Sequence, residues 1–310
     1  MFTHQKPDLT SLQIKDIARI TIWGVGLIGG SLGLALKKNG FEGERVGLGR
    51  NIGRLKIAQE LDAVDTITIH VSEGVQNSDL IVLCPPVNYV SLFVRDILEF
   101  VKSNEKHTVL TDVGSTKAVT VTAVDRMLDE TCSRNVSFVG GHPMAGSHKT
   151  GVGAADADLF DNSKCLLTPT EYTTEQALVL VKDLWHFVGA ETVLLSPESH
   201  DQLIGAASHL PHLIASILAN SIANAKTDER KALDFTATGF RDTTRIAAGA
   251  PELWTSIFAQ NTEVVLQLID NFVDNISEFR TLLETGNHAE IERILTEAQE
   301  IVIEQRNLRE

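Results

Sequence analysis

The sequence is poor in cysteine and has no long apolar run. Its 310 residues include three cysteines, an odd number whose spacing suits neither disulfides nor a metal site: Cys84, Cys132 and Cys165. Such usage is typical of a reducing compartment, and the polar first segment does not resemble a signal peptide, so we expect a cytoplasmic protein. No uninterrupted apolar run is long enough to span a bilayer, so no membrane partner is expected.

The sequence also has few positive charges. Its formal net charge is -14 at pH 7, and a polyanion would be repelled, so no nucleic-acid partner is expected. An anionic substrate would not be attracted either, so an anion site must gather its own cations. The hydrophobic share of 43% is that of a globular protein, and the length allows two domains.

Short apolar runs alternate with helical patterns over residues 17–195. The runs expected to form strands are Arg19–Trp23, Arg45–Gly49, Leu80–Cys84, Thr108–Val113, Ser137–Gly141, Lys164–Pro169 and Glu191–Leu195. This alternation predicts an α/β domain, a mostly parallel sheet covered by helices on both faces.

No strand pattern follows, and residues 196–310 are expected to form an all-helical domain. One long helix is predicted over Ser199–Ala225, with a kink at Pro211, and a second over Leu253–Leu283, with a last one from Asn287. Apolar residues recur at helical spacing in the second helix, which fits either a core or a dimer interface.

The first predicted strand leads into the segment GVGLIGGS, residues 24–31. A G-x-G-x-x-G sequence that follows a strand and opens a helix is typical of dinucleotide binding. Its glycines allow a tight turn, close approach of the backbone to a pyrophosphate and close helix packing. The residues expected to bind the cofactor here are Gly24, Gly26, Leu27, Ile28 and Gly29.

The end of the second predicted strand bears on the choice of cofactor. A carboxylate there would bind the ribose hydroxyls of NAD, but the strand ends in Gly49 and Arg50. No carboxylate repels a 2′-phosphate, and Arg50 can bind one through its planar fork. We therefore expect NADP, with NAD as the alternative if Arg50 stacks on the adenine or faces solvent.

Two later loops also follow strands and should reach the same edge of the sheet. One is TDVGSTK, residues 111–117, which includes Asp112 as a further expected cofactor contact, and the other begins GGHPMAG at residue 140. His142, at a strand end, can accept a proton at neutral pH and is the expected general base. Ser115 is expected either to orient it or to bond a substrate hydroxyl.

The helical part supplies candidate anion binders. Arg245 begins a predicted helix that is aimed inward, and in an acidic protein it can clamp a carboxylate. Arg241 with Asp242 is expected to form a structural ion pair. His209 and His212 are three residues apart, but no further Cys, His or carboxylate ligand has a suitable local spacing. No metal is therefore expected.

Taken in order, the motifs resemble those of the prephenate/arogenate dehydrogenases over about residues 20–283. The matching segments are GVGLIGGSLGLAL, TDVGSTK, GGHPMAGSHKTG, ADLFDNSKCLLTPT, SHLPH and GFRDTTRIAAGAPELW. The resemblance implies a modified Rossmann domain joined to a helical dimerisation domain, a homodimer formed through the C-terminal helices, and oxidative decarboxylation of a cyclohexadienyl acid.

The resemblance also implies residue roles. His142 would draw the proton from the ring hydroxyl with Ser115 as its hydrogen-bonding partner, and Arg245 would bind the carboxylate. His212 and Trp254 would lie in the substrate pocket, with Trp254 supplied across the dimer as an option.

One position departs from a common family pattern. The motif HPMAG is followed by Ser147 and His148, which are both expected to bind the substrate. Many relatives carry an acidic residue at the position of His148. A carboxylate would attract the ammonium of arogenate, and a histidine would not, so we expect prephenate. Asp156 or Asp158 approaching the site would favour arogenate or dual specificity instead.

Two more distant alternatives remain. A 3-hydroxyacid dehydrogenase would usually place a catalytic lysine on the entry helix, where this chain has His209 and His212. A nucleotide-sensing protein without turnover would keep the fold but would not need the set of His142, Ser115 and Arg245.

Overall fold

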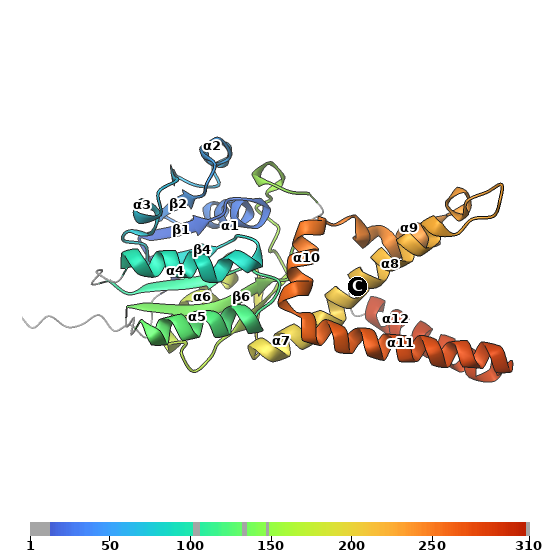
Figure 1. Ribbon diagram of the computed structural model, residues 1–310. Helices are drawn as coiled ribbons and strands as arrows, with labels where there is room; N and C mark the ends of the chain where they lie inside the picture. The colour runs from blue at the N-terminus through green and yellow to red at the C-terminus, as the bar shows by residue number, and fades with distance from the viewer. Residues whose placement is uncertain (1–12, 102–105, 132–134, 147–148, 308–310) are drawn as a thin grey trace, which may run out of the picture. The chain divides into compact units, whose positions relative to one another are not determined.

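The computed structural model describes residues 13–101, 106–131, 135–146 and 149–307. The chain divides into two compact units, Met1–Asn261 and Thr262–Glu310. The first contains a β-sheet with its covering helices and four further helices, and the second contains the last two helices (Figure 1). The first unit extends well beyond residue 195, the predicted end of the α/β domain.

The sheet has eight strands in the order β3-β2-β1-β4-β5-β6-β7-β8. Their bounds are β1 (Arg19–Trp23), β2 (Glu44–Leu48), β3 (Thr66–Thr68), β4 (Leu80–Leu83), β5 (Thr108–Asp112), β6 (Val136–Pro143), β7 (Lys164–Thr168) and β8 (Glu191–Leu194). All neighbours are parallel except β6 and β7. The seven predicted strands are present, and the unpredicted β3 is too short, at three residues, to give a recognisable alternation.

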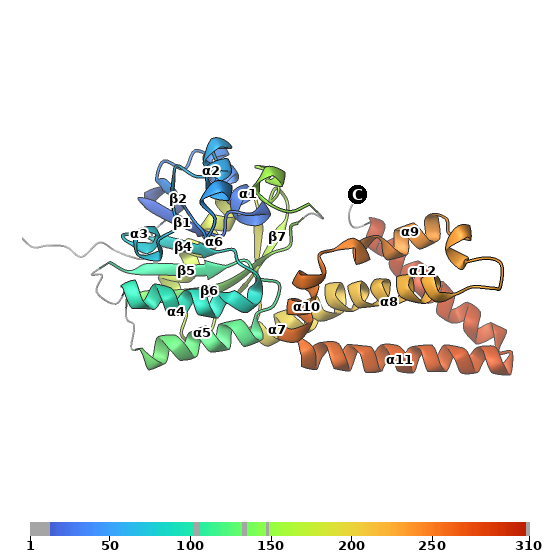
Figure 2. The same ribbon diagram turned by 45° about the horizontal axis from the view of Figure 1, so that its top comes forward.

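Helices cover both faces of the sheet (Figures 1 and 2). They are α1 (Leu27–Lys38), α2 (Ile52–Glu60), α3 (Val71–Val75), α4 (Val90–Val101), α5 (Ala118–Glu130) and α6 (Glu175–Phe187). Successive side chains of a strand point to opposite faces of the sheet, so β4 contributes to a core on each face. Leu80 and Val82 belong to the core cluster that includes α1 and α6, whereas Ile81 and Leu83 belong to the cluster that includes α4 and α5. The predicted α/β class is confirmed.

The strand order reverses at β1, which lies between β2 and β4. Connections from β1 and β4 therefore leave in opposite directions and open a crevice at the carboxyl edge of the sheet. The loops after β1, β5 and β6 all reach this edge.

The long helix predicted from Ser199 is interrupted, as its proline requires. It consists of α7 (Pro197–Ile204), a π-helical turn η5 (Gly205–His209) and α8 (Leu210–Asn224), with Pro211 in the first turn of α8. Proline has no N–H to continue the helical ladder, so the preceding turn widens. Two shorter elements follow, α9 (Thr238–Thr244) and the 3₁₀ turn η7 (Arg245–Ala248).

The single helix predicted over Leu253–Leu283 is wrong. The structure has α10 (Pro251–Gln260) and α11 (Thr262–Thr285), separated by Asn261. The Asn261 side chain is buried and donates 2.9 Å to the backbone oxygen of Asp201. This tertiary bond ends α10, and no helical periodicity could have indicated it.

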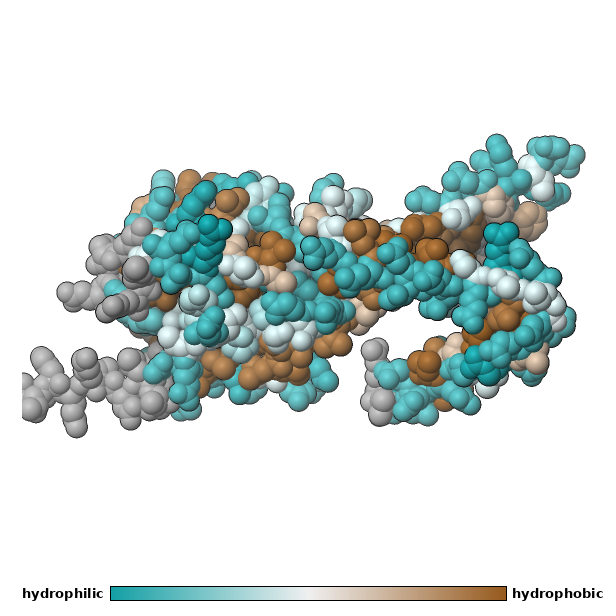
Figure 3. All heavy atoms as spheres, turned by 60° about the horizontal axis from the view of Figure 1, so that its bottom comes forward, coloured by the Kyte–Doolittle hydropathy of each residue, from teal (hydrophilic) through white to brown (hydrophobic). Residues whose placement is uncertain are grey.

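The second unit consists of α11 and α12 (His288–Asn307), which pack on one another. Val265 is the only buried side chain of α11, and α12 has none among its described residues. Large apolar side chains are therefore exposed on both helices, including Leu266, Ile276, Leu283, Leu295 and Ile301. Figure 3 shows apolar surface over the helical segments of the chain.

One helical stretch of the described chain, Pro197–Asn224, is long and apolar enough to cross a membrane by length and composition alone. This is weak evidence, because a helix of a soluble protein passes the same test. The stretch also carries His200, Asp201 and His209, whose side chains are buried in hydrogen bonds within the first unit.

Candidate active site

The loop between β1 and α1 has the geometry of a phosphate site. Gly24 has a φ of +105°, and a Cβ there would lie 2.9 Å from the carbonyl oxygen of Cys84, so only glycine fits. A Cβ on Gly29 would lie 2.4 Å from the Gly24 oxygen. By contrast, a Cβ on Gly26 would meet nothing within 4 Å, so the loop is open at that point.

The first turn of α1 leaves its N–H groups available. Its N-cap, Gly26, offers no side-chain hydrogen bond, and Leu27 and Ile28 are half-buried behind the opening. Unpaired N–H groups and the positive end of a helix dipole together attract an anion such as a pyrophosphate.

Three cationic residues follow β2 in the chain. Arg50, Arg54 and Lys56 are exposed, and the described structure shows none of them in an ion pair. A Cβ on Gly49 would lie 3.4 Å from Leu55, an ordinary contact, so packing does not require glycine at this position.

Asp112 lies at the end of β5 as predicted, but its side chain is not available as the predicted cofactor contact. Its side chain is fully buried, forms an ion pair with the equally buried Lys117, and accepts the N–H of Gly114 at 2.9 Å and of Gly141 at 3.0 Å. A side chain without exposed surface cannot contact a cofactor. Instead, it fastens the β5 loop to β6 one residue before His142.

His142, in β6, belongs to a row of hydrogen-bonded side chains. Its Nδ1 lies 2.9 Å from Nε2 of His200, and Nδ1 of His200 lies 2.8 Å from a carboxylate oxygen of Asp201. Asp201 in turn accepts the backbone N–H groups of Lys117 at 2.7 Å and Ala118 at 2.8 Å, at the start of α5. No partner for Nε2 of His142 is present in the described part of the chain.

The environment keeps His142 neutral. Burial lowers its pKa well below 6.5, and the nearby His200 and Lys117 lower it further. Burial also lowers the pKa of His200, despite its bond to Asp201. A neutral His142 with a free Nε2 is suited to accept a proton.

The sequence did not indicate His200 and Asp201 as site residues. They follow Ser196-Pro197-Glu198, which predicts only a helix start, and nothing local reveals that they contact His142. Ser115 is half-buried and makes no hydrogen bond to His142 in the described structure. His200 thus occupies the orienting position expected for Ser115, which leaves Ser115 available for a substrate hydroxyl.

The helical elements contribute an aromatic stack. The rings of His212 and Trp254 are stacked at 3.5 Å, and His209 meets Trp254 edge-on at 6.2 Å. Within the described residues, Nδ1 of His212 and Nε2 of His209 are buried without a hydrogen-bond partner. Buried unsatisfied polar atoms are costly, so these two are candidates for ligand contacts.

Arg241 and Arg245 form no ion pair in the described part of the chain. Arg245, in η7 and packed beside α8, is exposed rather than aimed inward as expected. Arg241 forms no ion pair with Asp242 in the described structure, so that prediction is wrong. Ser147 and His148, predicted to bind substrate, lie outside the described residues. No group of three metal-binding side chains is present among the residues described.

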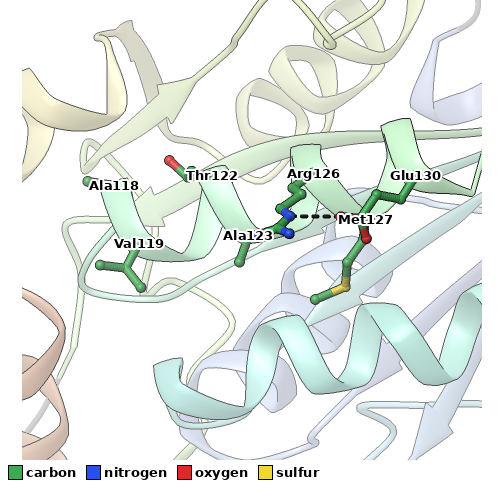
Figure 4. A pocket seen from close by; sticks show the side chains of 7 residues that line it. All are labelled: Ala118, Val119, Thr122, Ala123, Arg126, Met127 and Glu130. Atoms are coloured by element: carbon green, nitrogen blue, oxygen red, sulfur yellow. Dashed lines mark hydrogen bonds and ion pairs between the residues drawn. The ribbon is translucent and has the colours of Figure 1, made fainter.

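A hollow of about 650 Å³ lies on the outer face of α5 (Figure 4). It is lined by Ala118, Val119, Thr122, Ala123, Arg126, Met127 and Glu130. None of these is a predicted site residue, and Arg126 is already paired with Glu130. The hollow therefore lacks the chemistry found at the carboxyl edge of the sheet.

The fold and the site define an oxidoreductase with a nucleotide-binding sheet domain and a helical C-terminal part. The family model of the prephenate dehydrogenase nucleotide-binding domain matches residues 32–194, and that of the prephenate dehydrogenase dimerization domain matches residues 196–297. The chain belongs to the prephenate dehydrogenase family, which confirms the resemblance in its motifs.

Relatives support this over nearly the whole chain. The prephenate dehydrogenase of Bacillus subtilis is 36% identical, with 88% of this chain and 71% of the relative covered. The structure of Aquifex aeolicus prephenate dehydrogenase with hydroxyphenyl propionate and NAD+ has a TM-score of 0.85 at 31% identity, covering 93% of this chain and 98% of that chain. Synechocystis arogenate dehydrogenase has a TM-score of 0.77 at 28% identity, covering 90% and 96%.

Proposed function

We propose that this protein oxidatively decarboxylates prephenate to 4-hydroxyphenylpyruvate in tyrosine biosynthesis, in the cytoplasm. The observation that carries the proposal is His142, neutral and held with Nε2 free on the sheet edge that also carries the glycine loop. Nε2 accepts the proton of the ring hydroxyl and returns it to the phenol oxygen as carbon dioxide leaves. The glycine loop and the first turn of α1 would hold the pyrophosphate of a nicotinamide dinucleotide, which would supply the acceptor for the hydride of the hydroxyl-bearing carbon.

The substrate is bound by Arg245, by Ser115 and by the aromatic stack of His212 and Trp254. Arg245 clamps a carboxylate, and His212 with Trp254 forms a wall of the pocket, with Ser115 bonding the ring hydroxyl. Trp254 contacts His212 of its own chain, so the stack forms without a residue from a partner chain.

Gly249 is expected to be essential to this wall. A Cβ there would lie 2.6 Å from Nε1 of Trp254 and 3.1 Å from Cε1 of His212. Gly249→Ala should push the stack aside and raise KM for prephenate about 10-fold, in line with overpacking costs of about 1–3 kcal/mol. Steady-state kinetics checks this against Gly239→Ala, where a Cβ meets nothing within 4 Å. Equal effects of the two variants would contradict the assignment.

The preferred cofactor is NADP, with NAD as the weaker alternative. Arg50, Arg54 and Lys56 follow β2 and form no ion pair with any described residue, and Gly49 leaves no carboxylate to repel a 2′-phosphate. Gly49→Asp fits sterically and should lower kcat/KM for NADP by roughly 10–100-fold, while kcat/KM for NAD stays level or rises. Because the same variant is measured with both cofactors, a general loss of activity would be recognised. An unchanged kcat/KM for NADP in Gly49→Asp would contradict the NADP assignment.

Prephenate is preferred to arogenate because His148 stands at the position where many relatives carry an acidic residue. Asp158 is paired with Lys38, and Asp156 accepts the backbone N–H of Asp158 at 3.0 Å. The pairing with Lys38 leaves the Asp158 carboxylate less able to attract the ammonium of arogenate.

We also propose a homodimer in which residues 196–310 form the dimerisation domain and residues 17–195 the nucleotide-binding domain. The match to a dimerization-domain model and the exposed apolar side chains of α11 and α12 support it. Light scattering on the purified chain should give twice the monomer mass.

The deciding experiment is reduction of NAD or NADP with prephenate or arogenate, in all four combinations. Turnover with prephenate and NADP is the expected result. Turnover only with arogenate would correct the substrate. Cofactor binding without any turnover would instead support a nucleotide-sensing protein.

A further inference from the structure

In the row His142–His200–Asp201, the proposed reaction gives a role only to His142. His200 and Asp201 have no role in it yet. The members of the row come from β6 and from α7, and all are buried: His200 has no exposed surface, and Asp201 is 2% exposed. Asp201 is fixed at both ends, since its carboxylate caps α5 and its backbone oxygen accepts from Asn261. The row therefore has a fixed base, held by two backbone N–H groups at the start of α5 and by the side-chain amide of Asn261.

The direction of the hydrogen bonds follows from the chemistry of the end groups. A carboxylate that accepts two backbone N–H groups can only accept from a third partner, so Nδ1 of His200 must carry a proton. Neutral His200 then has its lone pair on Nε2, 2.9 Å from Nδ1 of His142. Nδ1 of His142 must donate that bond, which leaves the lone pair of His142 on Nε2.

We propose that His200 and Asp201 are positioning residues that fix His142 in the tautomer whose Nε2 accepts the substrate proton. The proposal rests on the proposed function for its kinetic consequence. When Nε2 of His142 holds the substrate proton, the imidazolium donates from Nδ1 to His200, and the buried carboxylate of Asp201 faces the resulting positive charge. Neither residue touches the substrate.

The alternative is that the row is only packing. Asp201 would cap α5 equally well without His200, so capping does not explain why a fully buried imidazole joins Asp201 to His142. A packing role needs the volume of the ring. A tautomer-fixing role needs a hydrogen-bond acceptor at the position of Nε2 of His200. Substitutions of His200 can therefore distinguish the packing role from the tautomer-fixing role.

His200→Leu and His200→Gln make this separation. Leucine fills the space but cannot accept a hydrogen bond, whereas glutamine can place its amide oxygen near the position of Nε2. We expect His200→Leu to lower kcat roughly 100-fold with KM for prephenate changed less than about 3-fold, and His200→Gln to recover at least about 10-fold of the loss. His186→Gln, at an exposed histidine of α6, is the control. If Leu and Gln variants lose activity equally, the row is packing.

A second measurement does not depend on turnover. In protein labelled with ¹⁵N-histidine, NMR distinguishes protonated from unprotonated ring nitrogens. His142 should show a protonated Nδ1 and a bare Nε2 in the wild type, and a shift toward a protonated Nε2 in His200→Leu. A protonated Nε2 of His142 in the wild type would overturn the positioning role of His200 and Asp201. The expected tautomer in a protein without prephenate turnover would instead refute the proposed function and leave the positioning role standing.

Discussion

Replacing His142 with asparagine is expected to lower kcat by roughly 10²–10⁴-fold, the range for loss of a general base, with KM for prephenate within a few-fold of wild type. Asparagine is close in size to histidine and keeps a hydrogen-bonding group facing His200, but it cannot take a proton at neutral pH. The wild-type acid limb of kcat/KM should fall below pH 6.5, because burial lowers the pKa of His142 and only the neutral ring is a base.

Arg245→Gln is the matched contrast. Arg245 is exposed and without an ion pair in the described structure, so its loss removes the charge that we propose binds the carboxylate and leaves His142 intact. KM should therefore rise more than kcat falls. Stopped assays over pH 5–9 with both variants separate the two roles. If His142→Asn retained wild-type kcat and the same acid limb, His142 would not be the base.

The parts of the site that could be predicted from the sequence are those with a local pattern. The glycine loop and His142 each follow an apolar strand, and parallel strands bring such loops to one edge of the sheet. Arg50 follows β2, which pairs with β1, so the same reasoning predicts its place at this edge.

The parts that could not be predicted depend on tertiary contacts between distant segments. His200 and Asp201 lie about sixty positions from His142 in the chain, in a stretch whose local pattern predicts only a helix. Asn261 ends α10 through a bond to Asp201, so the predicted continuous helix was wrong for the same reason. The place of Asp112 at a strand end predicts a cofactor contact. Only the folded chain shows that Asp112 is buried in an ion pair with Lys117.

Lys117→Met is expected to destabilise the protein by about 3–5 kcal/mol, the usual cost of removing one partner of a buried ion pair. Both charges have 0% exposure, and without Lys117 the Asp112 carboxylate keeps only the two backbone N–H groups of Gly114 and Gly141. Urea unfolding with an unchanged m-value measures the loss. The variant should also move the acid limb of activity upward, because Lys117 helps to lower the pKa of His142.

A control on the neighbouring surface tests whether burial is the cause. Arg126→Met breaks an ion pair with Glu130 on α5 whose side chains are 79% and 59% exposed, and it should cost less than about 1 kcal/mol. Adding Asp112→Asn to Lys117→Met removes the orphaned charge and should recover part of the loss. If Lys117→Met were as mild as Arg126→Met, the buried pair would not be what fastens the β5 loop to the strand that carries His142.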